Sequence, residues 1–125
     1  MKLRLLDDSI RLRLSQGEVL AAGEQRLVEG QTRFPDGSVF TFALEAVENA
    51  AAPSAAYAQD RMVVRLPAAE VSAWARDDAA VSLVGELELP RGGLLRLLVE
   101  KDFRCLTPRD EEDQSDLFAN PEGSC

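Results

Sequence analysis

The chain has 125 residues, of which 46% are hydrophobic and 29% charged, a composition typical of one globular domain with its own core. Its net charge is −8 at pH 7, and residues 110–125 carry six acids and no base, which disfavours nucleic acid as a partner. No apolar run approaches the roughly 20 residues of a membrane span, and acids at Asp7 and Asp8 interrupt the start of the chain before a signal peptide could form. We therefore expect a cytoplasmic protein without a membrane partner.

The first predicted elements are two strands, over residues 2–5 and 10–14, where apolar and charged side chains alternate strictly. The polar residues between them are typical of a turn, so the two strands should form a hairpin. The apolar residues of the second strand face the core, which leaves Arg11 and Arg13 on its opposite face.

A short helix and a second hairpin are predicted next. Ser15 and Glu18 have the spacing of a capping box at the start of a helix, and Gly23 is expected to end it. Residues 26–34 and 38–46 then form a hairpin around the turn sequence Pro-Asp-Gly-Ser. Residues 48–56, rich in alanine and interrupted by a proline, are expected to form a surface loop.

The second half of the chain begins with a predicted strand over residues 62–66 and a helix. Pro67 is expected to start this helix, because proline is tolerated in a first turn, where its missing amide proton has no partner. Trp74 should pack the helix onto the sheet, and Asp77 should end it.

A third hairpin and an acidic arm complete the chain. Apolar and polar residues alternate over residues 81–89, where Gly85 is interpreted as a bulge. The turn of residues 90–93 leads into a last strand over residues 94–101. Periodicity then stops, which predicts an acidic C-terminal arm over residues 103–125.

The two halves share an internal repeat. Arg13-Leu14 and Glu18-Val19 recur 52 residues later as Arg65-Leu66 and Glu70-Val71. The pattern Phe40-x-Phe42-x-Leu44-Glu45 likewise aligns with Leu95-x-Leu97-x-Val99-Glu100. A repeat of this kind indicates a tandem duplication of one strand–helix–hairpin unit, with copies over residues 10–45 and 62–100.

The expected fold class is therefore α+β, in a single domain of residues 1–125. We expect a mostly antiparallel sheet or a small barrel of about six or seven strands, with two short helices related by pseudo-two-fold symmetry.

The sequence offers few residues for catalysis or metal binding. Histidine is absent, and the two cysteines, Cys105 and Cys125, lack the close spacing of a zinc site, so we expect no catalytic residue, no metal and no cofactor. The strand arginines form either a solvated sheet face or a surface that recognises anions, because a guanidinium fork suits carboxylates and phosphates. The candidate ligand-binding residues are Arg4, Arg11, Arg13 and Arg65.

Patterns at both ends of the chain carry a family resemblance. The chain opens with Met-Lys-Leu-Arg and, later, Ser-Ile-Arg-Leu-Arg-Leu-Ser-x-x-Glu-Val. It closes with Glu-Lys-Asp-Phe-Arg-Cys-Leu and then Glu-Asp-x-Ser-Asp-x-Phe-x-Asn-Pro. In both patterns the chain resembles a family of small bacterial proteins of unknown function, which implies no particular activity. The order of elements is also similar in outline to swapped-hairpin and double-psi barrels, an analogy that says little about function.

Two functions follow from these observations. The leading hypothesis is a non-enzymatic interaction or ligand-binding module with an arginine-lined sheet face, whose partner is a protein or a small anionic ligand. The alternative is a metal-dependent enzyme that acts on an anionic substrate through the acidic arm, because carboxylates are the oxygen ligands of hard divalent cations.

Overall fold

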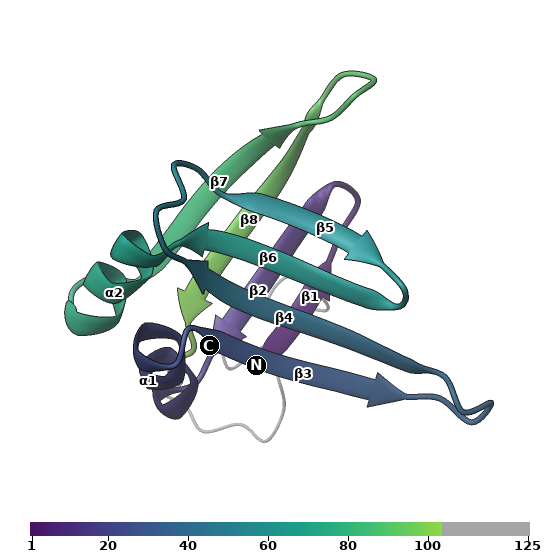
Figure 1. Cartoon of the computed structure of the whole chain (residues 1–125), viewed down its shortest axis with the longest axis horizontal. Coiled ribbons are helices and arrows are strands. Elements are labelled where there is room, and N and C mark those ends of the chain that lie inside the picture. The colour runs from purple at the N-terminus through teal and green to yellow at the C-terminus, as the bar shows by residue number, and fades with distance from the viewer. Residues whose placement is uncertain (104–125) are drawn as a thin grey trace, which may run out of the picture.

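The computed structural model describes residues 1–103, which form two helices and eight strands in two four-stranded sheets (Figure 1). The α+β class predicted from the sequence is confirmed. The predicted acidic arm lies, except for Phe103, outside the described residues. Neither helix in the described part of the chain is long and apolar enough to cross a membrane.

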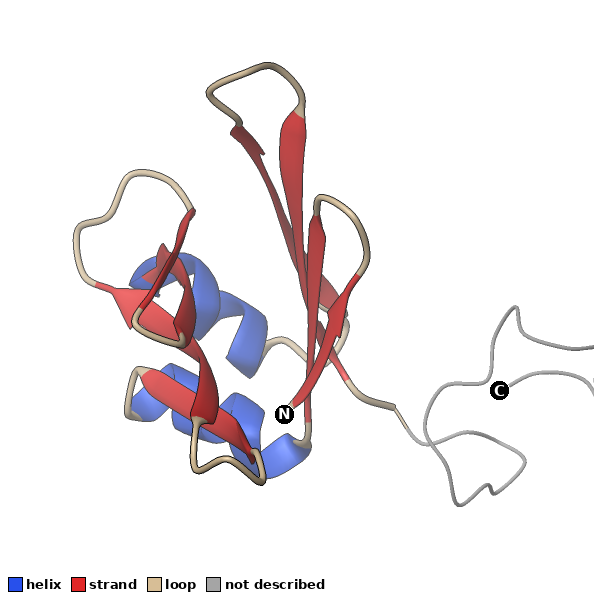
Figure 2. Ribbon diagram, turned by 90° about the vertical axis from the view of Figure 1, so that its right-hand side faces the viewer, coloured by secondary structure: helices blue, strands red, loops and turns tan. Residues whose placement is uncertain are grey.

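The strands divide into two sheets that lie as separate layers (Figure 2). Sheet A has the order β1-β2-β8-β7, with bounds Lys2–Leu5, Ser9–Leu14, Leu94–Lys101 and Ser82–Glu88. Sheet B has the order β3-β4-β6-β5, with bounds Leu27–Arg33, Val39–Val47, Arg61–Pro67 and Ser54–Ala58. The helices α1, Gln16–Glu24, and α2, Ala68–Arg76, lie side by side at one end of the molecule, on the left of Figure 1.

Each sheet combines hairpins from both halves of the chain. The hairpin β1–β2 joins the hairpin β7–β8 through a parallel pairing of β2 with β8. In the same way, β3–β4 joins β5–β6 through a parallel pairing of β4 with β6. The sheets are therefore mixed, although four of the six pairings are antiparallel, as expected. The expectation was wrong in the number of strands, which is eight in residues 1–103, and in a single sheet, because the strands form two. Periodicity along a strand identifies its buried face but carries no information about its neighbours.

The pairing registers of the two sheets match position by position. Arg13 lies opposite Glu100 across the parallel pair of sheet A, and Arg65 lies opposite Glu45 across that of sheet B. Both halves also have the same element order, two strands, a helix and two strands. The repeated residues of the sequence thus occupy matching places in the two sheets.

The core lies between the sheets and under the helices. Its most deeply buried large side chains are Leu12, Leu14, Leu44, Val64, Val71, Trp74 and Val99. Trp74 packs α2 onto this core as predicted, with 2% of the residue exposed. Its indole nitrogen donates a hydrogen bond to the carbonyl oxygen of Val81 at 3.1 Å, so the buried polar atom is satisfied.

Helix α1 begins as predicted but ends differently. The backbone nitrogen of Ser15 donates to the Glu18 carboxylate at 2.8 Å, and the Ser15 hydroxyl oxygen accepts from the Glu18 backbone nitrogen at 3.4 Å. Gly23 does not end the helix, which continues to Glu24. Instead, a side-chain carbon at Gly23 would lie 3.1 Å from Cβ of Ala75, so the glycine allows α1 to approach α2 closely. Helix α2 follows Pro67 and ends before Asp77, as predicted.

Two further expectations were wrong. Residues 54–56 of the predicted loop belong to the edge strand β5, whose alanines lack the apolar–polar contrast that marks a strand. Gly85 is not a bulge, because it pairs with Leu97 in an unbroken ladder. A side-chain carbon there would lie 3.2 Å from Cγ of Pro53, so this glycine lets the β4–β5 connection pack against β7.

Candidate functional site

The outer face of sheet A gathers cationic side chains from its first two strands. The hairpin register sets Lys2 opposite Arg13 and Arg4 opposite Arg11. Because the alternate residues of β2 are buried in the core, these four side chains share the outward face. We call the surface formed by Lys2, Arg4, Arg11, Arg13 and Glu100 the arginine face.

Glu100 of β8 lies at the centre of the arginine face. Arg11 donates to its Oε1 from Nε at 2.7 Å and approaches the same oxygen with Nη2 at 2.6 Å. Arg13 donates to this oxygen from Nε at 2.8 Å. The Glu100 side chain is 14% exposed, and those of Arg11 and Arg13 are 27% and 24% exposed. The two guanidinium groups therefore converge on one carboxylate-sized position at the protein surface.

The ionisation of Glu100 responds to these contacts. Partial burial by itself raises the pKa of this carboxyl group. Hydrogen bonds from Arg13 and Arg11, together with their positive charges, outweigh burial and hold the pKa of Glu100 below its ordinary value. The carboxylate is consequently charged at neutral pH and keeps both arginines in place.

Asp102 borders the arginine face, where the described chain ends. Its carboxylate lies 3.1 Å from the Lys2 amine, and its backbone nitrogen donates to the carbonyl oxygen of Leu14 at 2.9 Å. The end of β8 is thus fixed beside β2 and β1. Among residues 1–103, the acids that pair with the cations of β1 and β2 are Glu100, with Arg11 and Arg13, and Asp102, with Lys2.

The structure brings three of the four predicted ligand-binding residues together and separates the fourth. Arg4, Arg11 and Arg13 lie on sheet A, whereas Arg65 lies on the outer face of sheet B. Arg65 donates from Nε to Oε1 of Glu45 at 2.8 Å, which is the same contact that Arg13 makes with Glu100. The sequence analysis missed the place of Glu100 in the site, although its repetition as Glu45 was a signal for a paired role.

The matching registers allow the outer faces of the two sheets to be compared residue by residue. Ser54 lies opposite Arg65 and Ala56 lies opposite Val63, as Lys2 lies opposite Arg13 and Arg4 opposite Arg11. Sheet B therefore repeats the Arg13–Glu100 contact but has serine, alanine and valine where sheet A has Lys2, Arg4 and Arg11. At these matched positions the arginine–glutamate contact is common to both faces, whereas Lys2, Arg4 and Arg11 have no cationic counterpart on sheet B.

Comparison with known proteins identifies the family. Residues 1–122 match the model of DUF7009, a family of unknown function. The chain belongs to this family. No curated protein and no solved structure that we compared matches the chain. The expectation of a family without known activity is confirmed, while the two terminal patterns and the bacterial origin stay predictions.

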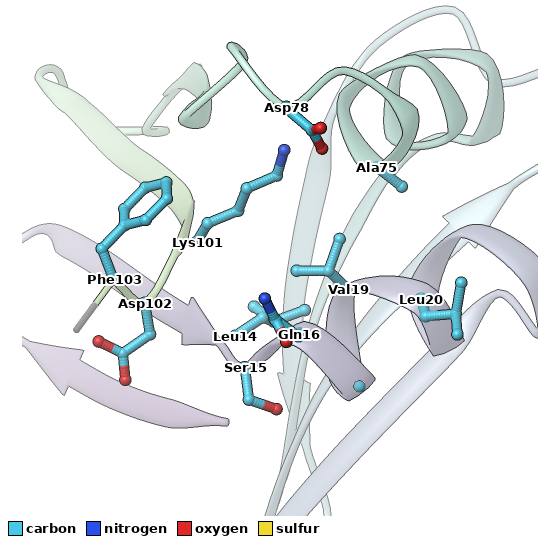
Figure 3. A pocket seen from close by; sticks show the side chains of 11 residues that line it. Leu14, Ser15, Gln16, Val19, Leu20, Ala75, Asp78, Lys101, Asp102 and Phe103 are labelled. Carbon is cyan, nitrogen blue, oxygen red and sulfur yellow. The ribbon is translucent and has the colours of Figure 1, made fainter.

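A mixed polar and apolar pocket of about 870 Å³ in this DUF7009 chain has Asp102, which borders the arginine face, among its lining residues (Figure 3). Its walls come from the start of α1, the end of α2 and the end of β8, with Gln16, Asp78 and Lys101 among the lining residues. The Lys101 amine donates to the carbonyl oxygen of Asp77 at 2.8 Å and lies 5.5 Å from the Trp74 ring centroid. These contacts give the lysine a structural role that holds β8 against α2.

A second, apolar cavity of about 460 Å³ opens at the end of the DUF7009 fold away from the helices. Its lining comes from both sheets and comprises Leu5, Ile10, Phe40, Ala55, Ala56, Tyr57, Met62 and Leu95. Apolar side chains form its walls, and the ring centroids of Phe40 and Tyr57 lie 6.5 Å apart. None of these described lining residues is an aspartate, a glutamate, a lysine, an arginine or a cysteine.

Residues 1–103 contain no group of three or more acids and cysteines that could hold a metal ion. The acids of the predicted enzymatic alternative lie in residues 104–125, and so do both cysteines, all outside the described residues.

Proposed function

We propose that this member of the DUF7009 family is a cytoplasmic, non-enzymatic binding module whose arginine face recognises an extended acidic segment of a partner protein. The observation that carries the proposal is the difference between two matching faces. Sheet B maintains its central contact with one arginine, Arg65, so the fold does not require the further cations that sheet A presents. We therefore assign a role in recognition, rather than in folding, to Lys2, Arg4 and Arg11.

The spacing of the four cations favours an extended peptide as ligand. Lys2 and Arg4 are two residues apart on β1, as Arg11 and Arg13 are on β2, which separates them by about 7 Å along each strand. The two strands are about 5 Å apart across each opposing pair. Alternate side chains of an extended peptide are also about 7 Å apart. A carboxylate at position i can therefore meet the pair Lys2 and Arg13, while one at position i+2 meets the pair Arg4 and Arg11.

Glu100 supports this function by orienting the arginines before the ligand arrives. A guanidinium has five N–H donors in a rigid fork, so it can bind the protein's own carboxylate and a second one at the same time. With Arg11 and Arg13 held by the same oxygen, less side-chain entropy is lost when a ligand binds.

The test is a titration of the purified protein with two peptides of equal composition. One is an acetylated peptide of about six Glu-Ser repeats, and the other repeats Glu-Glu-Ser-Ser, which gives the same composition but never sets two glutamates at positions i and i+2. The alternating peptide should bind more tightly, and raising the salt to roughly 0.5 M should weaken its binding because the charges are at the surface. Inorganic phosphate in place of the peptide tests a small anion as the ligand, and tighter binding of phosphate would contradict the peptide proposal.

The matched variants transfer the side chains of sheet B to sheet A. Arg4→Ala and Arg11→Val should each weaken peptide binding by about threefold to tenfold, which corresponds to roughly 0.7–1.4 kcal/mol per charge-assisted contact. Arg61→Ala on sheet B, which removes a surface partner of Glu29, is the control and should leave binding unchanged. Equal effects from sheet A and sheet B variants would show that net charge, not this face, attracts the peptide.

We also propose that the two halves arose by duplication of one strand–helix–hairpin unit. The matching registers and the repeated arginine–glutamate contact support this origin. In a crystal structure of the protein, residues 10–45 should superpose on residues 62–100 with the same order of elements. A different placement of the two helices relative to their strands would contradict the duplication.

A further inference from the structure

The described chain ends at the border of the arginine face. Asp102 is fixed there by its ion pair with Lys2 and by its hydrogen bond to Leu14, and Phe103 follows directly. Any residues that follow therefore start beside the opposing pair of cations Lys2 and Arg13. The position where the described chain ends thus gives the C-terminal segment direct access to this surface.

The segment that follows has the composition of a ligand for this face. Residues 104–125 carry six acids, four of them consecutive in residues 110–113, against two bases, Arg104 and Arg109. Asp110 and Glu112 are two residues apart, the spacing that the arginine face favours. Six residues lie between Phe103 and Asp110, and the seven steps that join these two residues can span up to about 25 Å, more than the distance of about 7 Å between Lys2 and Arg4 along β1.

We propose that the acidic run of residues 110–113 binds the arginine face of its own chain and competes there with an external acidic partner. The proposal rests on the function proposed above for the class of ligand. Charge complementarity and the short connection favour this occupant over a second copy of the chain, because a tethered segment has an effective concentration in the millimolar range. The segment then sets the minimum affinity that a partner needs, because the partner must displace the chain's own acids from the arginine face.

The first test measures the contact in the full-length protein by NMR. A nitroxide spin label is attached at Ser115→Cys in a chain whose own cysteines are replaced, C105S and C125S. The backbone amide signals of β1, β2 and β8 should broaden, while those of β3 and β5 should keep their intensity. Broadening of both sheets alike, or of neither, would overturn the proposal.

The matched control removes the charge of the segment but keeps its length. In this variant residues 110–113 become amides, D110N, E111Q, E112Q and D113N. Broadening of sheet A signals should fall to the level of sheet B, and roughly 0.5 M salt should have the same effect on the unmodified segment. Broadening that persists in the amide variant would mean that apolar contacts hold the segment, and the proposed role of these acids would be wrong.

The second test separates this inference from the proposed function. The alternating glutamate peptide is titrated into the full-length protein and into the amide variant, and it should bind the variant about tenfold more tightly, because the competitor has been neutralised. If the peptide binds neither protein while sheet A signals still broaden, the segment contact stands and the proposed function fails. If the peptide binds both equally and no signal broadens, the function stands and the segment contact is wrong.

Discussion

Arg13 and Arg65 show how one residue type can link the two halves of the molecule. Each donates from Nε to a glutamate that lies across a parallel strand pair, at the same distance of 2.8 Å. In both cases the arginine and the glutamate come from different halves of the chain. On sheet A a second arginine, Arg11, shares the glutamate, so Glu100 has two partners where Glu45 has one.

This sharing predicts that Arg11 and Arg13 compensate for one another. Arg11→Val and Arg13→Val should each lower the free energy of unfolding by about 1 kcal/mol or less, because the other arginine still binds the half-buried Glu100. The double variant leaves this carboxylate without either arginine and should cost more than the sum, by about 0.5–3 kcal/mol. Urea unfolding of the four proteins measures the coupling, and additive losses would show that the two contacts are independent.

Glu100 also predicts a dependence of stability on pH. Its pKa is lower in the folded state than its ordinary value of 4.5, so its contribution is present above that pH and is lost as the pH falls through the folded-state pKa. Glu100→Gln should therefore destabilise the protein by about 1–3 kcal/mol at pH 7, and the difference from the wild type should shrink below about pH 4. Thermal melts of both proteins between pH 7 and pH 3 give this difference. A constant difference across the range would contradict the ionic role of Glu100.

At the scale of elements, the two helices depend on each other for their position. Gly23 has no side chain where α1 meets Ala75 of α2, whereas Gly17 of the same helix has no heavy atom within 4 Å of the place a side chain would take. Gly23→Leu should overpack the contact and cost about 1–3 kcal/mol, measured by chemical denaturation. Gly17→Leu is the matched control and should leave stability unchanged or raise it by up to about 0.8 kcal/mol, because leucine favours helix. Equal costs at both positions would show that the helices do not touch through Gly23.

Local signals in the sequence predicted most of these elements. The capping box gave the start of α1, and turns rich in glycine and proline marked the hairpins, where Gly37 and Gly92 adopt φ of 94° and 97° that favours glycine. The sequence did not predict β5, because its small side chains show no alternation. The prediction that Gly23 ends α1 was also wrong, because the neighbouring sequence does not distinguish a glycine that ends a helix from one that faces another helix.

At the scale of the whole molecule, the sheets interlock the two halves. Each half supplies one hairpin to sheet A and one to sheet B, so neither half can form a complete sheet alone. We therefore expect residues 1–50 and residues 51–125, expressed as separate fragments, to melt without a cooperative transition. Their mixture should regain a cooperative transition in circular dichroism, because the parallel pairs β2–β8 and β4–β6 can then form. A fragment that folds as a monomer would contradict this account.

The same interlocking explains why only part of the candidate site was predictable. Alternation along β2 and β6 correctly placed Arg11, Arg13 and Arg65 on outward faces. It could not reveal that β2 and β6 belong to different sheets, because that depends on pairings between residues far apart in the sequence. Arg65 was therefore grouped with arginines that it does not meet, and Glu100 was left out of a site at whose centre it lies.

The interlocked hairpins also have a consequence for synthesis on the ribosome. The inner edges of β2 and β4 bind β8 and β6, which are made later, so the first half emerges with two strand edges that have no partner yet. The edge of β2 stays without its partner strand for the longest time, until residues 94–101 have left the ribosomal tunnel. Exposed edges of this kind can pair with other nascent chains. Slow translation of the second half should therefore lower the soluble yield, and a chaperone that covers strand edges should restore it.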